Sequence, residues 1–331
     1  MAAAGAAVLV TGAGVIGGLT ARMLAARGQH ALLLDVAPPR GRLPDGVEFE
    51  RCDITDLAAL EPLLRARPIR GVVHTAALLS TGIRKDPVRG VAVNALGTAH
   101  VLDCARRLGL GRVVFASSST VGYSTFVAAQ GPAIAEDFAM RVVSERPASI
   151  YAATKLFGEH LALLHGDLLG VDVVVLRYGA VLGGRLDAPT SVPGRLLARL
   201  AEAARGGTRV ALDDPHLSWG GIEEFVDARD CARANLHALD AASPSRRVYN
   251  VATGEAVTLR DFVGAARAAL GALGALDVEL GPEPPTGFAG FPHRRPAPSS
   301  TEAARAELGF ACVHGLEDSI RFWTSPASQE G

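Results

Sequence analysis

Short runs of apolar residues alternate with helical stretches through the first two-thirds of the chain, and this alternation constrains the fold most. The apolar runs cover residues 8–10, 31–34, 71–74, 112–115 and 171–176, and segments with helical periodicity lie near residues 15–27, 56–65, 88–108 and 151–166. Strands joined by helices of about ten or more residues pair in parallel and are covered by helices on both faces. The sequence therefore predicts an α/β fold built on a doubly wound parallel sheet.

The alternation weakens beyond residue 180, where glycine and proline interrupt the pattern. We expect a sheet domain formed by residues 1–180 plus about 225–255, and a smaller α/β lobe formed by about 181–224 and 256–331. The lobe should lie over the carboxyl ends of the strands, where doubly wound folds bind ligands. A proline-rich segment at residues 282–298 is either a mobile lid or a rigid connector.

A glycine-rich turn lies between the first predicted strand and the first predicted helix. Its glycines are Gly12, Gly14 and Gly17, and Val15 and Ile16 open the helix. Gly12 permits a tight turn, Gly14 lets the backbone approach a diphosphate, and Gly17 allows the helix to pack closely on the strand. Free N–H groups and the helix dipole favour an anion at such a helix start. The sequence therefore predicts a dinucleotide site here.

Acidic residues at the ends of the next strands bear on which dinucleotide binds. Asp35 ends the second predicted strand, where a carboxylate accepts hydrogen bonds from ribose hydroxyls and repels a 2′-phosphate, so NAD is favoured over NADP. Arg40 and Arg42 follow closely and could weaken that preference, and Asp35 could also simply cap a loop. Asp53 follows the third predicted strand and could reach the adenine edge or start a helix.

Lysine is almost absent from the chain, which makes the position of Lys155 informative. The 33 basic residues include only Lys85 and Lys155, and Lys155 follows one of only four tyrosines, Tyr151, by one helical turn. A phenol has an ordinary pKa of about 10. A nearby ammonium group and a cationic nicotinamide ring would both lower that pKa, so that Tyr151 could take a proton from a substrate hydroxyl. The alternative is a tyrosine that packs on its own helix beside a solvated lysine.

Charge and cysteine content exclude several classes of function. The net charge is −1, which favours neither a nucleic acid nor an anionic membrane as a partner. The four cysteines are far apart and show no metal-ligand spacing, as expected for thiols in a reducing compartment. The cysteine spacing therefore predicts that the protein binds no metal. We also predict a cytoplasmic enzyme, because the apolar N-terminus lacks the basic residues of a signal peptide.

These features together resemble the extended short-chain dehydrogenase/reductase family, also called the NAD-dependent epimerase/dehydratase family. The resemblance implies a Rossmann domain, a small substrate lobe, bound NAD, a small-molecule substrate, and homodimers formed through a four-helix bundle. It assigns proton handling to Tyr151 and Lys155, with Ser118 assisting and Thr120 nearby. The cofactor-binding residues expected on all these grounds are Gly12, Gly14, Val15, Ile16, Gly17, Asp35, Asp53, Ile54, Ala76, Tyr151, Lys155 and Tyr178.

Several positions differ from the pattern that the family implies. Ser119 and Thr120 stand where dehydratases carry Asp-Glu, and Ala180 and Glu223 stand where sugar-nucleotide members often carry asparagine and arginine. The arginine grips a diphosphate, so we expect the charge of Glu223 to face the ligand and repel phosphate. Arginines at 195, 294 or 295 could replace the missing arginine. We therefore expect an NAD-dependent dehydrogenase or reductase of a small hydroxy or keto substrate. One alternative is a sugar-nucleotide epimerase that works by transient oxidation. Another is a non-catalytic dinucleotide sensor, but the intact Tyr151/Lys155 pair argues against it, because a sensor needs no proton transfer.

Overall fold

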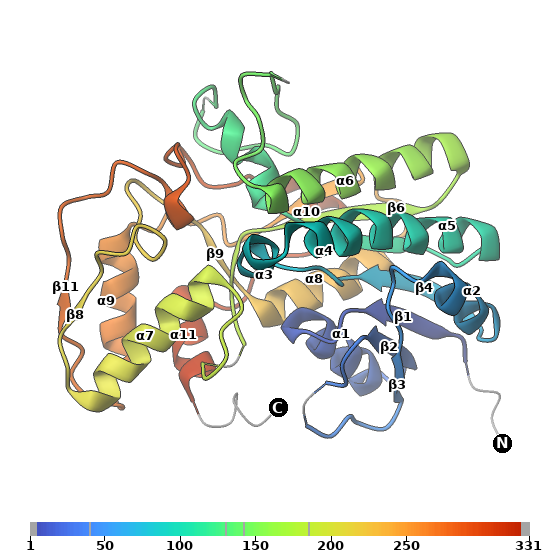
Figure 1. Cartoon of the computed structure of the whole chain (residues 1–331), viewed down its shortest axis with the longest axis horizontal. Helices are drawn as coiled ribbons and strands as arrows, with labels where there is room; N and C mark the ends of the chain where they lie inside the picture. The colour runs from blue at the N-terminus through green and yellow to red at the C-terminus, as the bar shows by residue number, and fades with distance from the viewer. Residues whose placement is uncertain (1–4, 40, 130, 142, 185, 326–331) are drawn as a thin grey trace.

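A parallel sheet of seven strands forms the centre of the part of the chain that the computed structural model describes, residues 5–325 except 40, 130, 142 and 185 (Figure 1). Its order is β10-β6-β5-β4-β1-β2-β3. The strands are β1 (Ala7–Thr11), β2 (Ala31–Asp35), β3 (Val47–Arg51), β4 (Ile69–His74), β5 (Val113–Ser118), β6 (Val173–Tyr178) and β10 (Val248–Val251). The predicted doubly wound parallel sheet is confirmed.

The chain changes direction across the sheet at β1. From β1 it proceeds to β2 and β3 on one side, and then returns to β4 on the other side of β1. The connections that follow the carboxyl ends of β1 and β4 therefore leave in opposite directions. A crevice opens between such connections, and ligands of doubly wound folds bind there.

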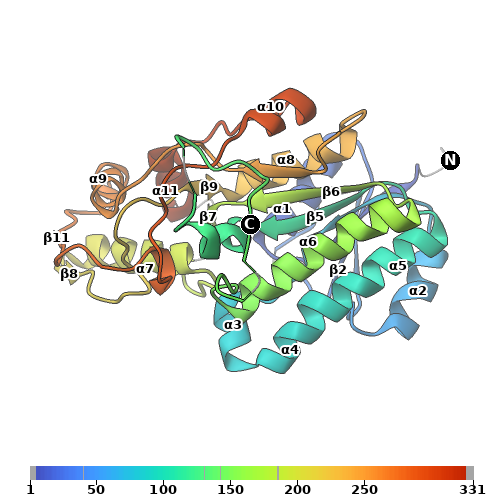
Figure 2. The ribbon, with the colours of Figure 1, turned by 90° about the horizontal axis from the view of Figure 1, so that it is seen from above.

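Helices cover both faces of the sheet (Figure 2). Apolar residues of α1 (Val15–Ala26), α8 (Ala228–Asp240) and α10 (Glu302–Leu308) pack on one face, and those of α2 (Leu57–Arg65), α5 (Thr98–Leu108) and α6 (Ile150–Leu169) pack on the other. The strand residues between these two layers are almost fully buried. Burial on both faces explains why the strands appear in the sequence as continuous apolar runs.

The predicted helix at residues 88–108 is broken into three pieces. They are α4 (Pro87–Val91), the π-helical segment η1 (Ala92–Gly97) and α5, and a short α3 (Ser80–Lys85) precedes them. The π-helical turn carries Asn94, whose side chain accepts a hydrogen bond from the N–H of Leu78 at 2.8 Å and donates one to its carbonyl at 3.0 Å. This bond pair fixes the loop after β4 on the crevice side of the sheet.

A smaller lobe lies beside the carboxyl ends of the strands, on the left in Figure 1. An aromatic cluster formed by Trp219, Phe225, Phe262 and Phe288 lies at its core. The lobe's elements are β7 (Ala180–Leu182), α7 (Val192–Gly206), β8 (Val210–Ala211), β9 (Phe225–Asp227), α9 (Leu259–Leu270), β11 (Val278–Glu279), η3 (Phe288–Gly290) and α11 (Leu316–Thr324).

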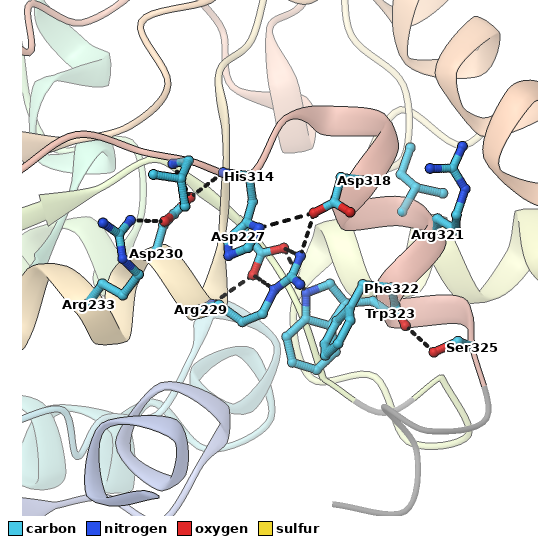
Figure 3. A network of polar contacts seen from close by, with 12 residues as sticks. Asp227, Arg229, Asp230, Arg233, His314, Asp318, Arg321, Phe322, Trp323 and Ser325 are labelled. Carbon is cyan, nitrogen blue, oxygen red and sulfur yellow. Dashed lines mark hydrogen bonds and ion pairs between the residues drawn. The ribbon is translucent and has the colours of Figure 1, made fainter. Parts of the chain in front are cut away.

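The C-terminal segment is fixed to the start of α8 by a network of charged residues (Figure 3). Asp230 accepts hydrogen bonds from the N–H groups of Val313 and His314 at 3.1 and 3.0 Å. The guanidinium of Arg229 donates hydrogen bonds to the carboxylate of Asp227 at 2.8 Å and to that of Asp318 in α11 at 3.0 Å. This segment places α10 on the sheet and α11 in the lobe core. The division of the chain into two domains at the boundaries expected from the sequence stays a prediction.

Candidate active site

The glycine turn after β1 is pressed against the loop that follows β4. Gly12 has φ +89°, and a Cβ added there would lie 2.7 Å from the backbone nitrogen of Ala76. A Cβ at Gly17 would overlap the carbonyl oxygen of Gly12 and approach the hydroxyl of Thr75. Only glycine fits at these two positions, because the turn conformation and the close helix packing leave no room for a side chain.

The helix α1 starts at a glycine that has open space where a side chain would be. Gly14 is the N-cap residue, makes no side-chain cap, and would have no atom within 4 Å of an added Cβ. The first turn of α1 carries no acidic residue. The N–H groups at the start of a helix, here from Val15 and Ile16 onward, attract an anion, and no acidic side chain of the first turn opposes one. This arrangement fits the diphosphate of a dinucleotide.

Asp35, at the end of β2, is bonded to the glycine turn. Its carboxylate accepts hydrogen bonds from the N–H of Ala13 at 2.7 Å and from the N–H of Ala37 at 3.1 Å. Asp35 thus caps its own loop and also orders the turn next to the predicted ribose position; its contact with a ribose stays a prediction. Arg42 is exposed, and Arg40 lies outside the described residues.

Asp53 does not start the next helix, so that alternative is wrong. The N-cap of α2 is Asp56, which accepts a hydrogen bond from Ala59 at 3.1 Å. Asp53 instead binds Thr55 and Arg89. Burial acts to raise the pKa of Asp53, but the hydrogen bonds from Arg89 and Thr55 outweigh it and hold the pKa below its usual value. The neighbouring Ile54 is buried in the core and packs against Gly97.

The predicted catalytic pair lies on α6, over the end of β5. Ser149 caps this helix by accepting a hydrogen bond from Ala152 at 3.1 Å, which places Tyr151 in the first turn and Lys155 in the second. The ammonium group of Lys155 lies 5.9 Å from the centre of the Tyr151 ring. Ser118, the last residue of β5, begins the 3-10 helix η2 (Ser119–Thr125) and accepts a hydrogen bond from the hydroxyl of Thr120 at 3.0 Å.

The pKa of Tyr151 differs from the expected lowering. Burial raises the pKa of its phenol to about 12, while an interaction with Ser118 acts in the opposite direction. Burial also lowers the pKa of Lys155 to about 8. The expected lowering of the Tyr151 pKa depended on a cationic nicotinamide ring as well as on the ammonium group. The pKa of about 12 reflects the protein's own groups alone. The protein alone therefore keeps Tyr151 protonated at neutral pH.

A buried ion pair, which the sequence analysis missed, fixes α6 to the sheet. Glu159 lies two turns after Tyr151 on the same face of α6 and pairs with Arg177 of β6. Its carboxylate also accepts a hydrogen bond from Ser117 at 2.9 Å, next to Ser118. The spacing of Tyr151, Lys155 and Glu159 at four-residue intervals was a signal that these side chains share one helix face.

Tyr178 lies at the end of β6 and reaches the opposite face of the sheet. Its hydroxyl donates a hydrogen bond of 2.6 Å to the side chain of Asn235 on α8, which in turn donates to Thr20 of α1 at 3.0 Å. Burial raises the pKa of Tyr178 well above its usual value. Tyr178 therefore connects β6 to the helix behind the glycine turn, and its contact with a cofactor stays a prediction.

Glu223 is not presented to a ligand, in contrast to the expectation that its charge would repel phosphate. Its side chain is 1% exposed and accepts a hydrogen bond from Tyr123 at 2.8 Å. Arg295, from the proline-rich segment, lies 3.5 Å from Glu223 and 2.7 Å from Glu224. Burial raises the pKa of Glu223, and Arg295 acts to lower it. The end of the proline-rich segment is therefore anchored to residues beside β9.

The other two arginines that were candidates for gripping a diphosphate also have acidic partners. Arg294 lies 3.1 Å from Glu283, and Arg195 lies 3.8 Å from Asp214. With Arg295 held by two glutamates, each of the three candidates is engaged within the protein.

Comparison with known proteins agrees with this geometry. A sequence model described as the NAD dependent epimerase/dehydratase family matches residues 8–252. The chain belongs to this family. It is 27% identical over 340 residues to UDP-glucose 4-epimerase of Bacillus subtilis, with 94% of each chain covered. It is 29% identical over 282 residues to dTDP-4-dehydro-6-deoxy-D-allose reductase of Streptomyces bikiniensis, covering 81% of this chain and 82% of that protein.

A solved structure of a family member extends the comparison to three dimensions. The crystal structure of Thermus thermophilus UDP-glucose 4-epimerase in complex with NAD superposes with a TM-score of 0.75 at 32% sequence identity, covering 96% of this chain and 97% of that one. The predictions of the family, of an NAD-dependent enzyme of the extended short-chain type and of NAD as its cofactor are thereby confirmed. The individual site residues stay predictions.

Proposed function

We propose that this family member performs net hydride transfer between NAD and a hydroxyl or ketone carbon of a small substrate that carries no nucleotide. The observation that carries the proposal is the Tyr151/Lys155 pair beside Ser118, at the same sheet edge as the glycine turn. The burial of Arg295 between Glu223 and Glu224 removes it as a partner for a diphosphate, which supports the absence of that group on the substrate.

Different residues at this edge of the sheet would bind different parts of the cofactor. The turn from Gly12 to Gly17 and the start of α1 would bind the diphosphate, Asp35 a ribose, and Asp53 the adenine. NAD, when bound, supplies the carbon that accepts or returns the hydride. The carboxyl end of β5 would then lie beside that carbon, since the strand is adjacent to β4 and the crevice.

Tyr151 would transfer the proton in this reaction. As a phenolate it would accept the proton of the substrate hydroxyl during oxidation, and as a phenol it would return that proton during reduction, while Ser118 would hold the same substrate oxygen by a hydrogen bond. Lys155 is buried and bonded to the strand, so its charge is fixed near the phenol. A positive charge at that place stabilises the phenolate relative to the phenol.

Epimerisation of a nucleotide-linked sugar is the second candidate, and the names of the relatives favour it. Absorbance of NADH distinguishes the two. Purified protein is incubated with NAD and panels of simple hydroxy compounds and of nucleotide sugars. Steady NADH accumulation with a simple hydroxy compound supports the proposal. Conversion of a nucleotide sugar to its epimer with flat absorbance, together with no reaction of the simple compounds, contradicts it.

We further propose that two copies associate through α5 and α6, which would form a four-helix bundle. Exposed apolar side chains lie on α6 and on the α4–η1 stretch that leads into α5: Val88, Val91, Leu96, Ile150, Phe157, Leu164 and Leu168. Phe157, Leu164 and Leu168 recur at helical spacing and share a face. Light scattering should give twice the chain mass, and Phe157→Glu with Leu164→Arg should give a folded monomer. A monomeric wild-type protein contradicts the dimer.

We also propose a cytoplasmic location for the enzyme. The four cysteines, all within the described residues, are free thiols, in keeping with a reducing compartment. Among the residues that the structure describes, no helix is both long and apolar enough to span a membrane. Fractionation of cells that produce the protein tests the location.

A further inference from the structure

The carboxylate of Asp53 is held on both oxygens by residues from two separate segments. Oδ1 accepts hydrogen bonds from the N–H and the hydroxyl of Thr55, at 2.9 and 2.8 Å. Oδ2 accepts one from Nη2 of Arg89, at 2.7 Å. Arg89 belongs to α4, which lies between β4 and β5 in the sequence, and Asp53 follows β3, so this contact joins segments that follow the carboxyl ends of two different strands. The two side chains are 41% and 31% exposed, which leaves the carboxylate accessible to a ligand.

The hydrogen bonds already made determine what Asp53 can still accept. Each carboxylate oxygen can accept about two hydrogen bonds. Oδ1 has two donors and Oδ2 has one, so a single acceptor position is left, on Oδ2. That position suits an exocyclic amino group, which offers an N–H. An oxo group at the same place would be disfavoured, because its oxygen and the carboxylate oxygen are both hydrogen-bond acceptors and would repel each other.

Stability alone does not explain the ion pair. An ion pair of this exposure stabilises a fold by only about 0–1 kcal/mol. The backbone of Arg89 is fixed at the start of α4, because Asp86 caps this helix by accepting a hydrogen bond from the backbone N–H of Arg89 at 2.9 Å, and the guanidinium itself is directed to Asp53. A planar guanidinium can also lie against a flat ring as well as donate hydrogen bonds. Arg89 thus has the geometry to orient the carboxylate and to contact a purine bound beside it.

We infer that Arg89 is a specificity-determining residue for the cofactor, which orients Asp53 so that the carboxylate accepts a hydrogen bond from the amino group of the purine. This inference rests on the proposed placement of NAD, with its adenine near the end of β3. In this arrangement Arg89 takes one lone pair of Oδ2 and leaves the other directed toward the ligand. Removing Arg89 frees the carboxylate to turn, and the amino group is then recognised less well.

The test compares the binding of two dinucleotides that differ at one group. NAD and its analogue with hypoxanthine in place of adenine, which has an oxo group instead of the amino group, are titrated calorimetrically into the full-length protein. The variants are Arg89→Met, which keeps the length of the side chain, and Asp53→Asn. Arg84→Met is the matched control, since Arg84 is an exposed arginine five residues earlier. Thermal melting confirms that each variant is folded.

The wild-type protein should bind NAD about tenfold or more tightly than the analogue, as expected for one hydrogen bond to a charged group. Arg89→Met and Asp53→Asn should reduce this ratio to about threefold or less, and Arg84→Met should leave it unchanged. A ratio that Arg89→Met does not alter overturns the inference while leaving the proposed function in place. A wild-type protein that binds neither dinucleotide overturns the proposed function and the inference with it.

Discussion

Lys155 donates a hydrogen bond of 2.7 Å from its ammonium group to the backbone carbonyl oxygen of Ala116. Ala116 lies two residues before Ser118 on β5, so this bond fixes α6, which carries Tyr151, to the strand that ends in Ser118. The ammonium group also lies 5.2 Å from the centre of the Phe115 ring. Lys155 therefore joins α6 to β5 as well as placing a positive charge near Tyr151.

Tyr151→Phe should abolish most turnover and leave cofactor binding intact, because the substitution removes only the oxygen to which we assign the proton transfer. A fall in kcat of about 10²–10⁴ is expected for the loss of a general acid–base group. Steady-state rates with the substrate found in the NADH screen, and calorimetric titration with NAD, provide the two measurements. Turnover close to that of the wild type would rule out Tyr151 as the proton-transfer residue.

NAD should make Tyr151 acidic. The pKa of about 12 keeps the phenol protonated at pH 9 when the protein is alone. A nearby cationic ring favours the phenolate, so with oxidised cofactor the phenolate should form as the pH rises through a lowered pKa. Burial raises the pKa of Tyr123, Tyr178 and Tyr249 too, so these three stay protonated in the same range. The difference absorbance of phenolate, recorded from pH 7 to 10 with and without NAD, should rise only with NAD and vanish in Tyr151→Phe.

Lys155 should make the protein more stable as the pH rises from about 8 toward 10.5. Its pKa in the folded state lies below the unfolded value, so the unfolded chain binds more protons in this range and the free energy of unfolding increases with pH. The difference of about 2.5 between the two pKa values, at about 1.36 kcal/mol per pKa unit, amounts to at most about 3.4 kcal/mol over the whole range. Urea unfolding at pH 7.5 and 9.5 should show about 2 kcal/mol of this increase in the wild type but not in Lys155→Met. An equal change in the two proteins would contradict it.

Gly14→Ala should block NAD binding without unfolding the protein. An added Cβ meets no protein atom within 4 Å, and the residue's φ of −68° is accessible to alanine. The cost to stability should stay below about 1 kcal/mol, the usual scale for an N-cap change. The methyl group would instead occupy the space proposed for the diphosphate and weaken NAD binding by about tenfold or more. Gly18→Ala, one turn further along α1, is the control and should bind NAD normally.

Arg295→Met should strongly destabilise the protein. The substitution leaves Glu223 and Glu224, 1% and 0% exposed, without their shared cation. Removing one partner of a buried ion pair costs about 3–5 kcal/mol. Arg294→Met is the matched control, since Arg294 is 43% exposed in its pair with Glu283 and should matter by about 1 kcal/mol or less. Chemical unfolding of the two variants provides the comparison, and equal losses would show that the buried cluster is not held by Arg295.

Local patterns in the sequence were sufficient to predict the sheet and the glycine turn. Strands buried on both faces leave apolar runs, and the close approach of Gly12 to Ala76 requires a residue without a side chain. The pairing of Tyr151 with Lys155 follows from helical spacing alone. These features depend on neighbours in the chain or on the rule that parallel strands end at one edge.

Features set by distant contacts could not be predicted in the same way. Glu223 was expected to face a ligand, but Arg295, 72 residues later, and Tyr123, 100 residues earlier, surround it. The pKa of Tyr151 depends on how deeply the first turn of α6 is buried, which no local pattern specifies. The π-helical turn at Asn94 interrupts a predicted regular helix because its side chain binds the loop after β4.

The path of the chain between its two lobes has a consequence for unfolding. After β7 the backbone builds part of the small lobe, returns for α8 and β10, leaves again for α9, comes back as α10 and ends in the lobe as α11. The core of the small lobe and the layer of α1, α8 and α10 on the sheet are complete only when all of these passages are in place. A protein shortened before α10 should therefore lose packing in both, since α10 belongs to the sheet layer and α11 to the lobe core.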